Sequence, residues 1–135
     1  MRAAAALRLP AALILIATPA LAERPMTGAE FDANTLGETI TFDYGNGLFG
    51  TEQFLPGRRV RWAFEGEPCI YGEWYEAGDQ ICFVYENDPD PACWHYFLEG
   101  GQIRGVFMGE GGGWEILESA RDGGPLTCPG PDVGV

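Results

Sequence analysis

Arginine is the only basic side chain of this sequence apart from one histidine, since it contains eight arginines and no lysine. Three of them cluster between positions 58 and 61. Arg59 and Arg61 are two positions apart, so in a strand they project from the same face. Paired guanidinium groups bind carboxylate or phosphate well. We therefore predict that Arg59 and Arg61 contact a ligand, with a cross-strand ion pair to Glu73 or Glu52 as the structural alternative.

The tryptophan side chains are the second group of candidates for ligand binding. The four tryptophans are Trp62, Trp74, Trp94 and Trp114, and aromatic residues make up 13% of the sequence. Such side chains line ligand cavities and protein-binding patches, and they also fill the cores of small barrels. We predict that Trp62 and Trp74 join the two arginines in binding a ligand.

The sequence contains little that supports a catalytic function. His95 is the only histidine and Ser119 the only serine, which has no Gly-x-Ser-x-Gly context. Cys-x-x-Cys pairs are missing, so no zinc site is expected. The carboxylates Glu86, Asp88 and Asp90 could contact calcium, but prolines between and after them favour a hairpin turn. We predict no catalytic residue, no metal and no cofactor.

The N-terminus has the features of a secretory signal peptide. Arg2 and Arg8 precede an apolar run from position 9 to 17, and Ala20-Leu21-Ala22 offers a cleavage site before Glu23. The apolar run is too short to span a bilayer. We predict cleavage after Ala22, export to the periplasm or the medium, and no membrane attachment of the mature protein.

The mature chain is small and acidic. Residues 23–135 are enough for one domain and a modest core. They retain six arginines beside all twenty acidic residues, a formal charge of −14. This charge disfavours nucleic acid and anionic lipid as partners and favours a cationic protein or a small ligand. We expect a monomer.

Cysteine usage agrees with export. The cysteines are Cys69, Cys82, Cys93 and Cys128, and two disulfides are expected in an oxidising compartment. Three pairings are possible. The turn expected at positions 86–91 would place Cys82 beside Cys93 on neighbouring strands, which favours this bridge and leaves Cys69 for Cys128.

The remaining pattern predicts one short helix followed by strands. Thr27 and Glu30 match a capping box, and Gly37 ends the helix. Turn residues then recur every 8 to 12 positions, which is typical of all-β chains. Eight strands are expected, at positions 38–44, 49–55, 59–64, 70–76, 80–85, 92–98, 102–108 and 114–118. Their short connections require an antiparallel meander. We predict a small barrel or a strongly bent sheet, followed by an extended C-terminal tail from Thr127 held by Cys128.

A family resemblance covers the middle of the chain, from position 57 to about 108. The residues that carry it are Gly57-Arg58-Arg59-Val60-Arg61-Trp62, Gly72-Glu73-Trp74-Tyr75, Ile81-Cys82-Phe83-Val84-Tyr85, Cys93-Trp94, Phe97 and Ile103. In this pattern the chain resembles a family of small exported bacterial proteins that carry domains of unknown function. The resemblance implies a β-meander of calycin-like shape and implies no activity.

Together these features predict an exported, non-enzymatic binding module. Its ligand would be a small apolar or anionic molecule inside the barrel, or another protein at the barrel rim. The alternative is a periplasmic inhibitor of a protease or lysozyme, because an acidic surface attracts a cationic enzyme.

Overall fold

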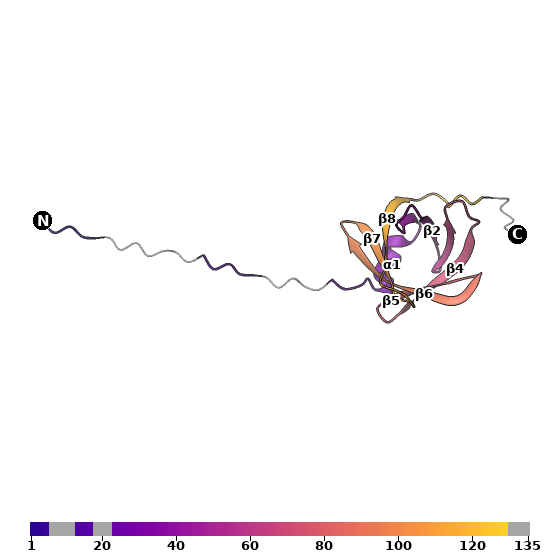
Figure 1. Ribbon diagram of the computed structural model, residues 1–135, viewed down its shortest axis with the longest axis horizontal. Coiled ribbons are helices and arrows are strands. Elements are labelled where there is room, and N and C mark those ends of the chain that lie inside the picture. Colours follow the sequence, from indigo (N-terminus) through magenta and orange to yellow (C-terminus); the bar gives the residue numbers. More distant parts are fainter. Residues whose placement is uncertain (6–12, 18–22, 130–135) are drawn as a thin grey trace.

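The folded part that the structure describes lies within residues 23–129. A computed structural model describes residues 1–5, 13–17 and 23–129. Residues 13–17 are exposed, and the described residues before Glu23 lie away from the folded part (Figure 1). The predicted cleavage site after Ala22 lies outside the described residues, as does the end of the predicted tail from position 130. No helix in the described ranges is both long and apolar enough to cross a membrane.

One helix and eight strands make up this part. The elements are α1 (Gly28–Thr35), β1 (Thr39–Asp43), β2 (Phe49–Leu55), β3 (Arg59–Phe64), β4 (Ile70–Ala77), β5 (Gln80–Tyr85), β6 (Asp88–Glu99), β7 (Gln102–Phe107) and β8 (Glu115–Asp122). Each strand pairs antiparallel with the next, and β8 pairs with β1. The sheet is therefore a closed barrel, seen as a ring of strands in Figure 1. Closure leaves no free sheet edge, which a bent open sheet would expose.

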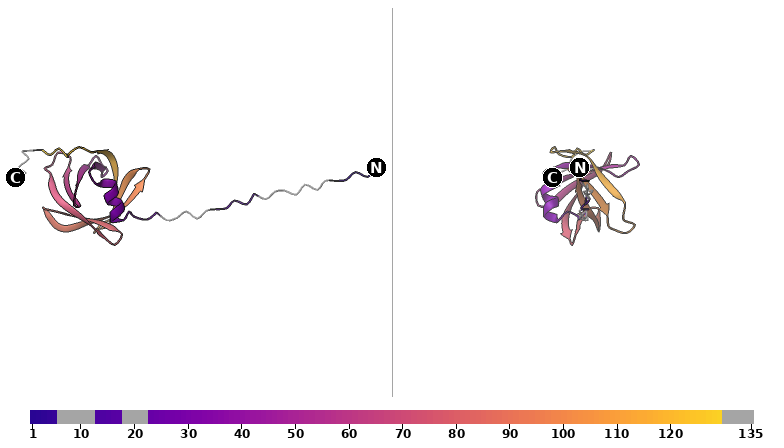
Figure 2. Two further views of the ribbon diagram at one scale, coloured as in Figure 1. Left: turned by 180° about the vertical axis from the view of Figure 1, so that it is seen from behind. Right: turned by 90° about the vertical axis from the view of Figure 1, so that its left-hand side faces the viewer.

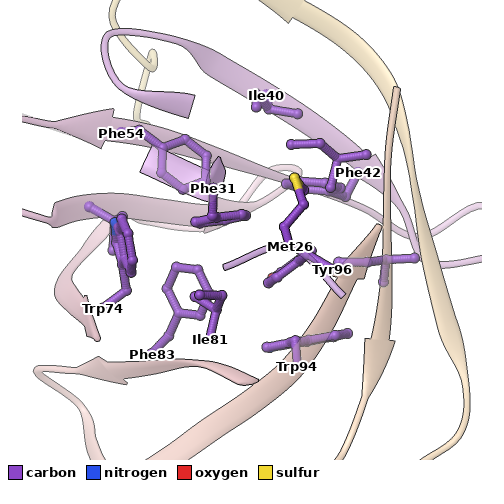
Figure 3. Close-up of a cluster of buried hydrophobic side chains, with 13 residues drawn as sticks. Met26, Phe31, Ile40, Phe42, Phe54, Trp74, Ile81, Phe83, Trp94 and Tyr96 are labelled. Carbon is purple, nitrogen blue, oxygen red and sulfur yellow. The ribbon is translucent and has the colours of Figure 1, made fainter. Parts of the chain in front are cut away.

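Alternation along the strands divides the side chains between the barrel interior and its surface. Ile40 and Phe42 of β1 are buried, as are Phe54 of β2 and Val60 of β3. Figure 3 shows Ile40, Phe42 and Phe54 converging with aromatic residues from β4, β5 and β6. The core is therefore the inside of the barrel.

Helix α1 covers one end of the barrel, which we call the closed end. Thr27 caps the helix as predicted, since its hydroxyl oxygen accepts the Glu30 N–H at 3.2 Å. Phe31 is fully buried, and its ring packs edge-on against Phe54 and Trp74. Figure 3 shows Phe31 in the middle of this cluster, and Figure 2 shows α1 lying against the strands.

Two strands are longer than predicted by more than one residue. β6 begins at Asp88 and not at position 92, so the turn after β5 is limited to Glu86 and Asn87. Prolines at 89 and 91 are tolerated because β6 pairs with β7 only from Trp94 onward. β8 continues to Asp122 because it follows β1 along its whole length.

Both disulfides have the predicted pairing. Cys82 and Cys93 face each other across β5 and β6. Cys69 and Cys128 join the segment before β4 to the C-terminal tail. Leu126 N–H also donates to the Gln53 side chain at 3.1 Å. The described part of the tail therefore lies against β1, β2 and β3, which it contacts through Thr39, Gln53 and Arg61.

Candidate functional site

Glu52 lies inside the barrel, near the end opposite α1. Glu52 belongs to β2, where it shares the inward face with Phe54, and its register partners are Ile40 and Trp62. Only 2% of Glu52 is exposed. We call this end of the barrel the Tyr44 end, after the residue that follows β1 there.

Only one of the two carboxyl oxygens of Glu52 has a hydrogen-bond partner. The Tyr85 hydroxyl donates a hydrogen bond of 2.8 Å to Glu52 Oε1. Glu52 Oε2 is buried and has no hydrogen-bond partner among the described residues. A buried oxygen without a partner costs about 1–3 kcal/mol, or more if it is charged. Such an atom in a native fold calls for an explanation.

A cavity of about 30 Å³ adjoins this carboxyl. Its walls are almost entirely aromatic and include no basic residue: Phe42, Tyr44, Glu52, Phe54, Trp62, Phe83, Tyr85, Trp94, Tyr96 and Ile116. A space of this size holds one or two water-sized groups. The chain therefore places one acid in an otherwise aromatic and apolar chamber.

Burial shifts the pKa values of the ionisable groups that line the chamber. Desolvation raises the pKa of Glu52 well above its ordinary value, and the Tyr85 hydrogen bond opposes this only in part. Burial and the nearby Glu52 carboxyl also raise the pKa of the Tyr44, Tyr85 and Tyr96 hydroxyls. Burial therefore favours the neutral, protonated form of the Glu52 carboxyl over the carboxylate.

Two glycines of the inward face make room for the rings. A Cβ on Gly50 would lie 2.0 Å from the Trp62 ring, and one on Gly72 would lie 2.7 Å from the Tyr85 ring. Both distances are too short for real contacts, so any larger residue would displace these rings. Gly72 therefore lets Tyr85 lie inward toward Glu52.

The Tyr44 end carries a continuous set of aromatic rings, which we call the aromatic rim. Its members are Tyr44, Trp62, Phe64, Trp94, Phe107 and Trp114. Adjacent ring centroids lie 4.9 to 6.0 Å apart, and every pair is edge-on or tilted. The rim joins the chamber to the surface, since Tyr44 and Trp62 also line the cavity while Trp114 is 43% exposed.

The two predicted arginines point away from this chamber. Arg61 donates to the Leu126 carbonyl oxygen and to Cys128 Sγ, so it holds the C-terminal tail. Arg59 borders a separate trough of about 450 Å³ on the outer surface of β3 to β5, together with Tyr71 and Glu73. The predicted ion pairs are wrong: Arg59 faces Glu73 in register without an ion pair, and Glu52 lies on the opposite face of the sheet.

The two predicted tryptophans lie at opposite ends of the barrel. Trp62 lines the chamber beside Glu52. Trp74 packs against Phe31 at the closed end and carries the Arg58 guanidinium over its ring at 4.4 Å. The structure therefore does not bring Arg59, Arg61, Trp62 and Trp74 together into one site.

The remaining candidates lie on the outside. His95 points outward, and its Nε2 lies 3.0 Å from Asp79 Oδ1 without a hydrogen bond. In the turn after β5, Glu86 accepts the Tyr71 N–H at 3.0 Å. Within residues 1–5, 13–17 and 23–129, no group of three acidic, histidine or cysteine side chains is placed to hold a metal.

Sequence reasoning missed Glu52 as a chamber residue. The signal was present, because Glu52 and Phe54 are two positions apart in a strand and must share a face. An acid on the same strand face as a core phenylalanine is expected to be buried, and a buried acid calls for an explanation. The sequence predicts that Tyr44, Tyr85 and Tyr96 lie in strands, but no spacing in it indicates that their hydroxyls lie close together.

The chain matches no protein-family model, no curated protein and no solved structure. The resemblance to small exported bacterial proteins therefore stays a prediction, and the site is interpreted from its own chemistry.

Proposed function

We propose that this protein is an exported, non-enzymatic binding module that holds a small ligand at the Tyr44 end of its barrel. The observation that carries the proposal is the unpartnered Glu52 Oε2 facing an aromatic chamber. Ligand sites are mostly apolar with a few polar groups that fix orientation. Small eight-stranded barrels are wide enough to hold one small ligand. The two disulfides support an oxidising, non-cytoplasmic location, with the periplasm as the proposed compartment.

Native mass spectrometry of the protein purified from the cells that produce it tests this proposal. We expect one small molecule bound per chain, released on collisional activation. Trp62→Leu should lose the bound molecule because it removes a chamber wall. Tyr75→Leu, on the outer face of β4, should keep it. A wild-type chain that carries no small molecule under gentle ionisation would contradict the proposal.

Inhibition of a protease or lysozyme is the second candidate. It is favoured by exposed apolar side chains in two loops at the Tyr44 end: Leu48, Met108 and Trp114 are 40% to 47% exposed. These loops adjoin because β1 pairs with β8. A formal charge of −12 for the whole chain suits a cationic enzyme. In the same spectra, a co-purified protein without a small molecule would favour this candidate.

A further inference from the structure

Two glutamates face the inside of the barrel, and only one of them is satisfied. Glu118 of β8 is 9% exposed, and both of its oxygens are engaged. Arg121 donates to Oε1 and Oε2 at 2.7 and 3.0 Å, and the Ile103 N–H donates to Oε2 at 2.7 Å. Glu52 has no cation, and one of its oxygens has no donor. The fold thus supplies a counter-ion for one interior carboxyl and withholds it from the other.

We propose that the missing counter-ion of Glu52 is the ligand, and that this ligand is a primary alkylammonium whose head group donates to Glu52 Oε2 inside the chamber. This inference rests on the proposed binding function and names the chemical class of its ligand. A buried carboxylate is stable only when it is paired and hydrogen-bonded. An ammonium head group supplies both the charge and the donors that Oε2 lacks.

The walls of the chamber favour a cation over an anion. The faces of aromatic rings are electronegative and attract ammonium groups, most strongly once water is excluded. Eight of the ten lining residues are aromatic, and none is basic. An anion would meet the Glu52 carboxyl with no positive group beside it, in a chain of formal charge −12. A cation would in contrast be attracted from a distance.

Size selects the kind of ammonium. The cavity of about 30 Å³ accepts a head group near the size of one or two water molecules. A primary ammonium fits this space, whereas a quaternary ammonium with four methyl groups exceeds it. The hydrocarbon part must then extend toward the half-buried rings of Tyr44 and Trp62, where the aromatic rim provides an apolar contact surface.

Binding would also move a proton. The groups that face the carboxyl are the hydroxyl of Tyr85, which donates to Oε1, and those of Tyr44 and Tyr96. No basic side chain lines the chamber. Because burial raises the pKa of Glu52, burial favours the protonated acid, whereas an ammonium ligand favours the carboxylate and so promotes release of the proton to solvent. Affinity should therefore rise with pH, up to the pKa of the amine itself, about 10.4 as for lysine.

Titration of the intact chain with small probes tests the ligand class. The readout is tryptophan fluorescence at pH 8 and pH 6, and the probes are n-butylammonium chloride, 1-butanol, sodium butyrate and tetramethylammonium chloride. We expect n-butylammonium to bind at least tenfold more tightly than the other three at pH 8, and more weakly at pH 6. This comparison uses the wild-type chain and does not depend on the folding of any variant.

Two variants complete the experiment. Glu52→Gln keeps the shape of the side chain and an acceptor for Tyr85, and it should weaken n-butylammonium binding at least tenfold. Glu73→Gln removes an exposed carboxyl of β4 and should leave binding unchanged. Equal affinity in Glu52→Gln would overturn the proposal, as would tighter binding of butanol or butyrate. If butanol or butyrate binds more tightly, the protein still has a small-ligand site, and only the proposed ligand class is wrong. If none of the four probes binds, the proposed binding function is contradicted as well.

Discussion

Glu52 makes the stability of this fold sensitive to pH. Its pKa is raised in the folded chain by burial, while in the unfolded chain it is near the ordinary value of about 4.3. Below the unfolded value both states carry the proton, and the contribution of Glu52 to stability is fully present. As pH rises above that value, the unfolded state loses its proton first, so the free energy of unfolding falls until pH reaches the folded pKa.

Glu52→Gln should remove this pH dependence. We expect the unfolding free energy of the wild-type chain, relative to that of Glu52→Gln, to fall as pH rises above the unfolded pKa of about 4.3. The slope should be at most about 1.4 kcal/mol per pH unit, the value for one proton. Denaturant unfolding at several pH values measures it, with Glu73→Gln as the exposed control. Parallel pH profiles of wild type and Glu52→Gln would contradict the burial of an ionisable carboxyl.

Other residues show how far the sequence predicts where a side chain points and what it contacts. The common face of Arg59 and Arg61 is confirmed, because alternation in a strand is a local property. What Arg61 binds depends on the C-terminal tail, which returns to β3 from 65 residues away. No spacing within β3 carries that information. Likewise, the pairing of Glu52 with Tyr85 depends on how barrel closure places β2 opposite β5.

Helix α1 is the element that distinguishes the two ends of the barrel. It fills the closed end with Phe31, whose ring stacks on Tyr96 at 4.6 Å and packs edge-on against Trp74. Backbone contacts hold it in place, since the Met26 N–H donates to the Tyr96 carbonyl and the Gly37 N–H to the Phe54 carbonyl. The opposite end has no helix among the described residues, and there the aromatic rim links the chamber lining to the exposed Trp114.

Phe31→Ala should therefore loosen the closed end. The ring is fully buried, so its removal leaves a cavity and should cost about 3–5 kcal/mol of unfolding free energy. Leu36→Ala is the matched control, because Leu36 at the end of the same helix is half exposed and should cost far less. Thermal and denaturant unfolding provide the measurement. A loss of under about 1 kcal/mol for Phe31→Ala would mean that α1 is not part of the core.

Strand and turn patterns predicted most elements of this fold. The bounds of β2, β3 and β5 agree with the expected ranges, because each strand lies between clear turn residues. β6 was predicted too short, since prolines normally end a strand in the middle of a sheet. Only the pairing of strands shows that positions 88–91 have no β7 neighbour, where proline is harmless.

At the scale of the whole molecule, the prediction of a barrel with two disulfides is confirmed. Closure rather than bending follows from the pairing of β1 with β8, which are the first and last strands. This pairing also brings the loops after β1 and before β8 together at the Tyr44 end. The chamber is a product of closure, because its lining comes from six of the eight strands and from Tyr44.

The four tryptophans allow the most direct test of where a ligand binds. Indole N–H resonances of Trp62, Trp74, Trp94 and Trp114 can be followed by NMR while n-butylammonium is added at pH 8. Our account predicts saturable shifts of Trp62 and Trp94, which line the chamber, and an unchanged Trp74 at the closed end. A response confined to Trp74, or no saturable response at any indole, would contradict a ligand site at the Tyr44 end.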